Sequence, residues 1–154
     1  MDLNALSRQV SKAALNVHKI LGPGLLEAVY LCCMVIELEH MHLKVQSEAP
    51  LVIFYRGQRV HSGRFHMDLL VEDTLVVELE ITEKIQDSHR KQLLTYLRLA
   101  NKPLGLLINF TESVEITAFP GFNPYLAQTD ISSSESLNLH GTGEEEVAPR
   151  QVSI

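Results

Sequence analysis

The chain has 154 residues, of which 45% are hydrophobic and 21% charged. These values fit a single globular domain with a substantial core and exclude a fibrous or wholly disordered chain. The net charge of −6 is uneven, because the segment after Leu126 contains five acidic residues and one basic residue. The remaining body is nearly neutral. This charge does not exclude a nucleic-acid partner, because such a protein needs basic residues only along the phosphate path.

The N-terminal segment contains the charged residues Asp2 and Arg8 within an amphipathic pattern, unlike the apolar segment of a signal peptide. No apolar run approaches the roughly 18 residues of a membrane span. We therefore expect a soluble, cytoplasmic protein with no membrane partner. Cys32 and Cys33 are adjacent within a predicted helix, which is typical of core thiols and of neither a zinc site nor a disulfide framework.

Two helices are predicted at the start of the chain. Apolar residues recur at helical spacing across residues 3–21, and Gly22-Pro23-Gly24 ends that pattern. A second helix is predicted over about residues 25–42. It has Glu27 in its first turn, where backbone N–H groups favour a negative charge.

The period changes to that of strands from Pro50 onward. One hairpin is predicted over residues 51–55 and 59–61, and a second over residues 64–71 and 74–81. Side-chain alternation places one set of residues together on each strand of the second hairpin. The two sets are Arg64, His66, Asp68 and Leu70 on the first strand, and Val76, Glu78 and Glu80 on the second.

A third helix is predicted from a cap at Asp87 or Ser88 to about Ala100, and Pro103 prevents its extension. Two strands follow at residues 104–110 and 114–119, the first apolar enough to be covered on both faces. This order of elements indicates a mixed α/β domain over residues 1–125. Residues 126–154 are rich in Ser, Thr, Gly and Glu and are predicted to form a disordered acidic tail.

Three carboxylates, Asp68, Glu78 and Glu80, occur where aliphatic side chains would normally be buried. Burial of one uncompensated carboxylate costs several kcal/mol or shifts its pKa, so the cluster indicates a cation, a proton or a basic partner nearby. A divalent metal ion is the simplest answer. The alternative is that Glu78 and Glu80 line the solvent face of an edge strand.

The third helix presents His89, Gln92 and Tyr96 on one face, with the spacing Q-x-x-x-Y in its last two members. Together with Asp68, the Glu78–Glu80 pair and the upstream segment Gly24-Leu25-Leu26-Glu27-Ala28-Val29-Tyr30, this pattern resembles the GxxExxY family, a branch of the PD-(D/E)XK nuclease superfamily. The resemblance covers nearly all of the body of the chain, from about Val17 through Phe110 to the strand that follows it.

The resemblance implies a restriction-endonuclease-like core, with a central mixed β-sheet flanked by α-helices. It implies that Glu27, Asp68 and Glu78 bind Mg²⁺ or Mn²⁺, which prefer oxygen ligands, and that the metal generates the nucleophile and stabilises charge on the scissile phosphate. It also implies that Gln92 and Tyr96 steady the substrate or the metal ligands, and that the partner is DNA or RNA. The catalytic residues expected in this way are Glu27, Asp68, Glu78, Glu80, Gln92 and Tyr96.

Glu80 departs from the family pattern, which has lysine at this position. The exchange removes a positive charge from the attacking water and adds repulsion, each effect being worth about 1 to 4 kcal/mol. Because about 1.4 kcal/mol changes a rate tenfold, hydrolysis would fall by orders of magnitude. Lys84 is a better candidate than Arg90 or Lys91 to replace the positive charge of the family lysine, because Arg90 and Lys91 lie off the helix face that carries Gln92.

Two functions therefore remain open. One is a divalent-metal-dependent nuclease that hydrolyses phosphodiester bonds, with activity reduced or lost through Glu80. The other is an inactive nuclease-fold module that binds nucleic acid or a protein partner. Arg56, Arg59 and Arg64 cluster around the first hairpin, where they could contact phosphates or form an ordinary solvated surface.

Overall fold

The computed structural model describes residues 1–60, 65–121 and 137–138. Within these residues no helix is long and apolar enough to cross a membrane. The elements in chain order are α1 (Leu3–Leu21), α2 (Glu27–His40), β1 (Val45–Pro50), β2 (Phe54–Tyr55), β3 (Gln58–Arg59), β4 (His66–Val71), β5 (Leu75–Glu80), α3 (Asp87–Leu99), β6 (Leu104–Phe110), β7 (Val114–Pro120) and β8 (Leu137–Asn138).

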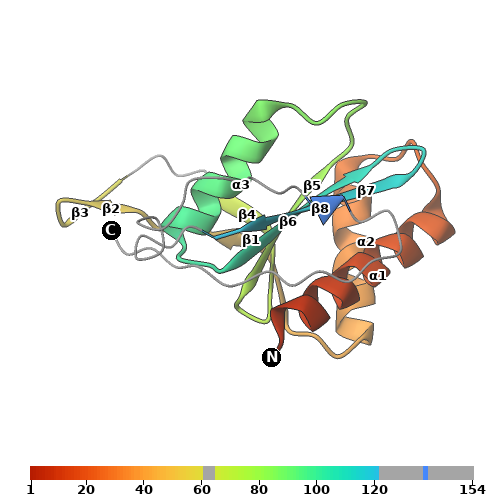
Figure 1. Ribbon diagram of the computed structural model, residues 1–154, viewed down its shortest axis with the longest axis horizontal. Coiled ribbons are helices and arrows are strands. Elements are labelled where there is room, and N and C mark those ends of the chain that lie inside the picture. The colour runs from red at the N-terminus through yellow and green to blue at the C-terminus, as the bar shows by residue number, and fades with distance from the viewer. Residues whose placement is uncertain (61–64, 122–136, 139–154) are drawn as a thin grey trace.

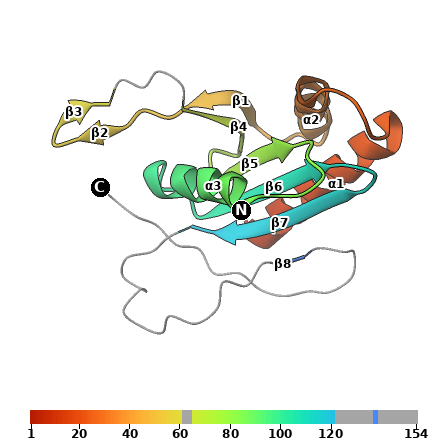
Figure 2. The same ribbon diagram turned by 90° about the horizontal axis from the view of Figure 1, so that it is seen from above.

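The molecule has three layers, with a mixed sheet between α1 and α2 on one face and α3 on the other (Figures 1 and 2). The strand order is β1-β4-β5-β6-β7-β8, and β2 and β3 form a separate two-stranded sheet. Only β5 and β6 pair in parallel, because α3 forms the crossover between them. This arrangement confirms the predicted restriction-endonuclease-like fold.

The sheet separates two hydrophobic cores. On one side α1 and α2 pack on residues such as Leu75, Val77 and Leu79 of β5. On the other side α3 packs on Val76 and Leu107. The close approach of α3 depends on Gly105, since a Cβ atom there would lie 2.7 Å from Cδ1 of Leu93. Strand alternation thus directs Glu78 and Glu80 toward the layer that contains α3.

The segment between α1 and α2 is held by Tyr30, which is completely buried. Its hydroxyl donates to the carbonyl of Gly22 at 2.6 Å and accepts from the N–H of Leu25 at 3.3 Å. Gly22 and Gly24 have φ values of 70° and 87°, which favour glycine. The ring of Tyr30 stacks on Phe110 with centroids 4.6 Å apart. These contacts fix the N-terminal end of α2.

Most of the predicted elements are confirmed, and their ends differ by a few residues. The strand β1 was not predicted, and the hairpin β2–β3 is shorter than expected because its strands contain two residues each. The N-cap of α3 is Gln86 in place of Asp87 or Ser88. The side chain of Gln86 accepts from the backbone of His89, whose ring in turn accepts from the backbone of Gln86.

The prediction for the cysteines was wrong in part, because Cys32 is exposed and Cys33 is only half-buried. Both are free thiols. The predicted disordered tail lies outside the described residues, apart from the two residues of β8, which pair with β7. The predicted strand residues His61 and Arg64 also lie outside the described residues.

Candidate functional site

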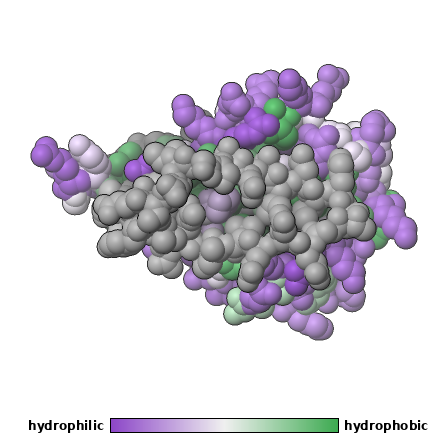
Figure 3. All heavy atoms as spheres, viewed as in Figure 1, coloured by the Kyte–Doolittle hydropathy of each residue, from purple (hydrophilic) through white to green (hydrophobic). Residues whose placement is uncertain are grey.

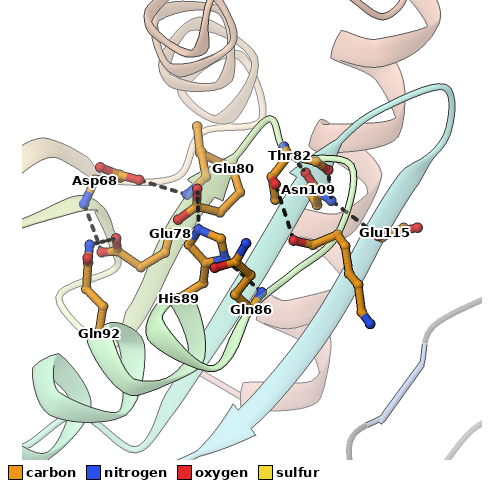
Figure 4. Close-up of polar contacts among 11 residues, drawn as sticks. Asp68, Glu78, Glu80, Thr82, Gln86, His89, Gln92, Asn109 and Glu115 are labelled. Carbon is orange, nitrogen blue, oxygen red and sulfur yellow. Dashed lines mark hydrogen bonds and ion pairs between the residues drawn. The ribbon is translucent and has the colours of Figure 1, made fainter.

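The strands β4 and β5 separate at the predicted acid cluster. Their paired residues run from Val71 and Leu75 to Leu69 and Val77 and no further. Beyond that point the backbone N–H of Asp68 donates to Oε1 of Glu78 at 3.2 Å, and the N–H of Leu79 donates to Oδ2 of Asp68 at 2.8 Å (Figure 4). Two carboxylates therefore accept the backbone hydrogen bonds that strand carbonyls would accept in a continuous ladder.

The same position is irregular on the other side of β4. Glu48 and Asp68 are left out of the paired residues of β1 and β4, and Glu48 has a φ of 49°. Met67 and Leu70 both pack in the core beneath α3, so the alternation of β4 slips by one residue at this point. The prediction that regular alternation carries His66, Asp68 and Leu70 on one face was therefore wrong in its detail, although it brought Asp68 to the site.

Glu78 is the most buried of the acids, with 2% of its surface exposed. It lies on β5 between β4 and β6, which excludes the alternative of a solvent-facing edge strand. Nε2 of Gln92 donates to Oε2 of Glu78 at 3.0 Å. Burial, followed by the charge of Asp68, raises the pKa of Glu78 from 4.5 to about 8, although hydrogen bonds from Asp68 and Gln92 oppose the shift.

The other acids are shifted in the same direction. Burial raises the pKa of Asp68, against a lowering effect of the Leu79 N–H, and the charge of Glu48 raises it further. Burial also raises the pKa of Glu27, and the charges of Asp68 and Glu80 add to this shift. Glu27 is the first residue of α2. The site thus combines acids from α2, β4 and β5 whose pKa values are all raised.

Glu80 lies beside a histidine. Nε2 of His89 is 3.6 Å from Oε2 of Glu80. Because Nδ1 of His89 accepts the backbone N–H of Gln86 at 2.9 Å, the ring proton is on Nε2 and faces Glu80. Burial raises the pKa of Glu80, whereas His89 lowers it. Lys84, predicted as the substitute cation, is exposed and forms no ion pair with Glu80 in the described part of the chain.

The residues that follow Glu80 are attached to β6 by Asn109, which is fully buried and opposite Glu80 in the parallel register. Oδ1 of Asn109 accepts the N–H of Thr82 at 3.0 Å, and its Nδ2 donates to the Thr82 carbonyl at 2.8 Å. Nδ2 also donates to Oε2 of Glu115 at 3.3 Å. The side chain of Asn109 thereby extends the β5–β6 pairing past the end of β5 (Figure 4). The sequence analysis did not identify this residue.

Tyr96 lies one helical turn beyond Gln92 and is buried. Burial raises the pKa of its phenol, and the negative charges of Glu78 and Asp68 raise it further, against a hydrogen bond with the backbone of His66. These electrostatic effects place Tyr96 beside the acid cluster. A hydrogen bond from Gln92 to Glu78 and charge effects among the other residues therefore link the six predicted residues Glu27, Asp68, Glu78, Glu80, Gln92 and Tyr96.

A cleft of about 760 Å³ opens beside this region. Its walls are the loop before α2, the segment after β5 and the turn between β6 and β7. None of the carboxylates of the cluster lines it, but Leu26 and Ile81, which do, are the chain neighbours of Glu27 and Glu80. His18 holds the turn between β6 and β7, because its Nε2 lies 2.8 Å from the carbonyl oxygen of Thr111.

The donors of the cluster are carboxylate oxygens, which suit a hard divalent cation such as Mg²⁺ or Mn²⁺. Burial is the main cause of their raised pKa values and neighbouring acids add to it, so a positive charge placed among them would favour their ionised forms. As the side chains stand, no three acids, histidines or cysteines of the described residues converge closely enough to hold a metal ion. Asp68 and Glu78 instead accept hydrogen bonds from backbone N–H groups.

A mixed sheet between helices, with carboxylates on two adjacent strands at its centre, is the arrangement of restriction-endonuclease-like proteins. The sequence model of the PD-(D/E)XK nuclease superfamily matches residues 4–119, which is most of the chain. The chain therefore belongs to this superfamily, whose nucleases generally depend on divalent metal ions. No curated protein and no solved structure matched it.

Proposed function

We propose that this chain is a divalent-metal-dependent nuclease of the GxxExxY branch, which hydrolyses phosphodiester bonds in DNA or RNA. The observation that carries the proposal is the break in the β4–β5 ladder, where Asp68 and Glu78 meet in a buried and electrostatically strained pair. Burial of two neighbouring carboxylates costs free energy unless a proton or a positive charge compensates them.

In this proposal Glu27, Asp68 and Glu78 hold Mg²⁺ or Mn²⁺. The bound metal would lower the pKa of water and stabilise the charge that develops on the phosphate. Gln92 keeps the Glu78 carboxylate oriented through its hydrogen bond. Tyr96 lies on the next turn of α3, close enough for the charges of Glu78 and Asp68 to raise the pKa of its phenol, and would steady the substrate or the metal ligands.

Glu80 takes the place of the family lysine as a proton acceptor. Burial and the charge of Asp68 raise its pKa, against a lowering effect of His89, and a carboxylate near the attacking water can act as a general base. As the water oxygen bonds to phosphorus and the bond to the leaving oxygen breaks, the water proton passes to Glu80, and the leaving oxygen takes a proton from solvent. The ring of His89 lies beside this carboxylate, with Nε2 3.6 Å from Oε2 of Glu80.

The test is cleavage of labelled single-stranded and duplex oligonucleotides in Mg²⁺ or Mn²⁺. We expect Asp68→Asn to abolish cleavage and Glu80→Gln to reduce it by orders of magnitude. Glu83→Gln is the matched control, because Glu83 is an exposed acid three residues from Glu80. The absence of metal-dependent cleavage at high protein concentration would refute the proposed activity.

A second function is favoured by one observation, the acid at the lysine position. Under this alternative the chain is an inactive nuclease-fold module that binds nucleic acid or a protein. Glu80→Lys separates the two functions. If Glu80 is the base, this change lowers cleavage further, whereas robust cleavage created by the lysine would show that the natural site is silent.

A further inference from the structure

The hairpin β2–β3 projects away from the three layers (Figures 1 and 2). Its two strands pair only with each other, through Phe54 with Arg59 and Tyr55 with Gln58. Residues 54–60 are all exposed. An isolated two-stranded hairpin is marginally stable in water, so a hairpin without support from the body gains stability from whatever binds it.

The charge of the hairpin is opposite to that of the chain as a whole. Residues 51–60 contain Arg56 and Arg59 and no acidic residue, in a chain with a net charge of −6. Neither guanidinium forms an ion pair with an acid in the part of the chain that the structure describes. The tip of the projection is hydrophilic in Figure 3. Its partner is therefore expected to be an anion.

The hairpin also exposes aromatic rings. Phe54 is 56% exposed and Tyr55 is 67% exposed. An exposed tyrosine keeps its hydroxyl in water, whereas an exposed phenylalanine on a projecting element has no such compensation. Because paired residues share a face, Phe54 lies beside Arg59 on one face, and Tyr55 lies beside Gln58 on the other. One face thus combines a ring with a guanidinium.

The base of the hairpin is close to the acid cluster. The N–H of Leu51 donates to the carbonyl of Phe65 at 2.8 Å, where the chain leaves β1 and enters β4. Phe65 is three residues before Asp68, which corresponds to about 10 Å along a strand. A polyanion bound along the hairpin would therefore be directed toward Asp68.

We propose that the Phe54–Arg59 face of the hairpin β2–β3, with Arg56 at its turn, binds single-stranded nucleic acid. Phe54 would stack on an unpaired base, and the two arginines would contact phosphates. Stacking requires a base face that is free of its neighbours, which a duplex does not offer. This inference rests on the proposed function and names its substrate as a single strand.

The experiment measures fluorescence anisotropy of the full chain with a labelled 20-nucleotide strand and with its duplex, in EDTA to prevent cleavage. Loss of one base–aromatic stack weakens binding by about 5- to 150-fold. We expect a loss in this range for Phe54→Ala and for Phe54→Leu with the single strand, little change with the duplex, and retained binding in Phe54→Trp. Arg59→Ala should reduce the salt slope of log K by about 0.7.

Tyr55→Ala is the matched control, because it removes an equally exposed ring from the opposite face. It should change single-strand binding less than twofold. An equal loss in Tyr55→Ala, full binding in Phe54→Leu, or an equal effect on the duplex would overturn the inference. Absence of any nucleic-acid binding at low salt would also overturn it and would assign the exposed ring to a protein partner.

The proposed nuclease activity and the proposed role of the hairpin can be refuted independently. Metal-dependent cleavage that is lost in Asp68→Asn, combined with normal binding by the Phe54 variants, would leave the nuclease and refute the role of the hairpin. Binding that depends on Phe54, combined with no cleavage in any metal, would leave the hairpin and refute hydrolysis. In each case binding in EDTA and cleavage in metal are independent measurements.

Discussion

The raised pKa of Glu78 makes the stability of the metal-free protein depend on pH. The folded state holds a proton on Glu78 up to about pH 8, whereas the unfolded chain loses it near pH 4.5. Between these values the folded state binds more protons, so the free energy of unfolding falls as pH rises. One pKa unit corresponds to about 1.4 kcal/mol, so Glu78 alone accounts for at most about 5 kcal/mol across this window.

The perturbation is Glu78→Gln, which keeps the side-chain oxygen for the N–H of Asp68 and removes the titration. Urea denaturation in EDTA from pH 5 to pH 8.5 gives the unfolding free energy of both proteins. The wild type should lose several kcal/mol over this range, and the variant should lose much less. Glu83→Gln, at an exposed position, should follow the wild type. A wild type whose stability is constant over this range, or a variant with the same slope, would refute the reasoning.

Three further predictions concern metal binding, the side chain of Asn109 and the hydroxyl of Tyr30. Binding of Mn²⁺, measured by calorimetry, should weaken by up to about tenfold for each pH unit below 8 and should release protons, because the metal replaces the Glu78 proton; affinity that is independent of pH would contradict this. In urea denaturation, Asn109→Leu should destabilise the protein by about 2 to 4 kcal/mol, because it leaves both backbone groups of Thr82 unpaired. Glu115→Gln is the control, and its expected cost is less than about 1 kcal/mol. Tyr30→Phe should cost about 1 to 3 kcal/mol in the same assay, because it removes both hydroxyl bonds and keeps the stack on Phe110; a change under about 0.5 kcal/mol would show that the hydroxyl does not hold the loop before α2.

The elements that the sequence predicts well are those with a strong local pattern. The helix α1 has a continuous apolar face, and β6 is apolar except for Asn109 and buried at every residue. By contrast, β1 has the sequence Val-Gln-Ser-Glu-Ala-Pro, which has three polar residues in succession and ends in proline. It is a strand because it pairs with β4 at the edge of the sheet, where proline is tolerated. Local propensity cannot predict such pairing.

The residues of the site also divide into those that a local sequence pattern predicts and those that depend on tertiary packing. Asp68, Glu78, Glu80 and the Gln92 face of α3 could be found from their spacing, whereas Glu27 was assigned to the site through the family resemblance. The contact of His89 with Glu80 depends on how closely α3 packs against the sheet, which no local pattern determines. The cap at Gln86 was missed because aspartate and serine are the preferred capping residues, and the reciprocal bond from the His89 ring outweighs that preference.

The break between β4 and β5 gives Asp68 and Glu78 a role in folding that is independent of chemistry. Each carboxylate accepts a backbone N–H that would otherwise be left unpaired within the sheet. A variant that had lost all chemistry would therefore still use both acids to complete its sheet. The carboxylate of Glu80 accepts no backbone N–H among the described residues, so a change at this position tests chemistry with less disturbance of the sheet than a change at Asp68 or Glu78.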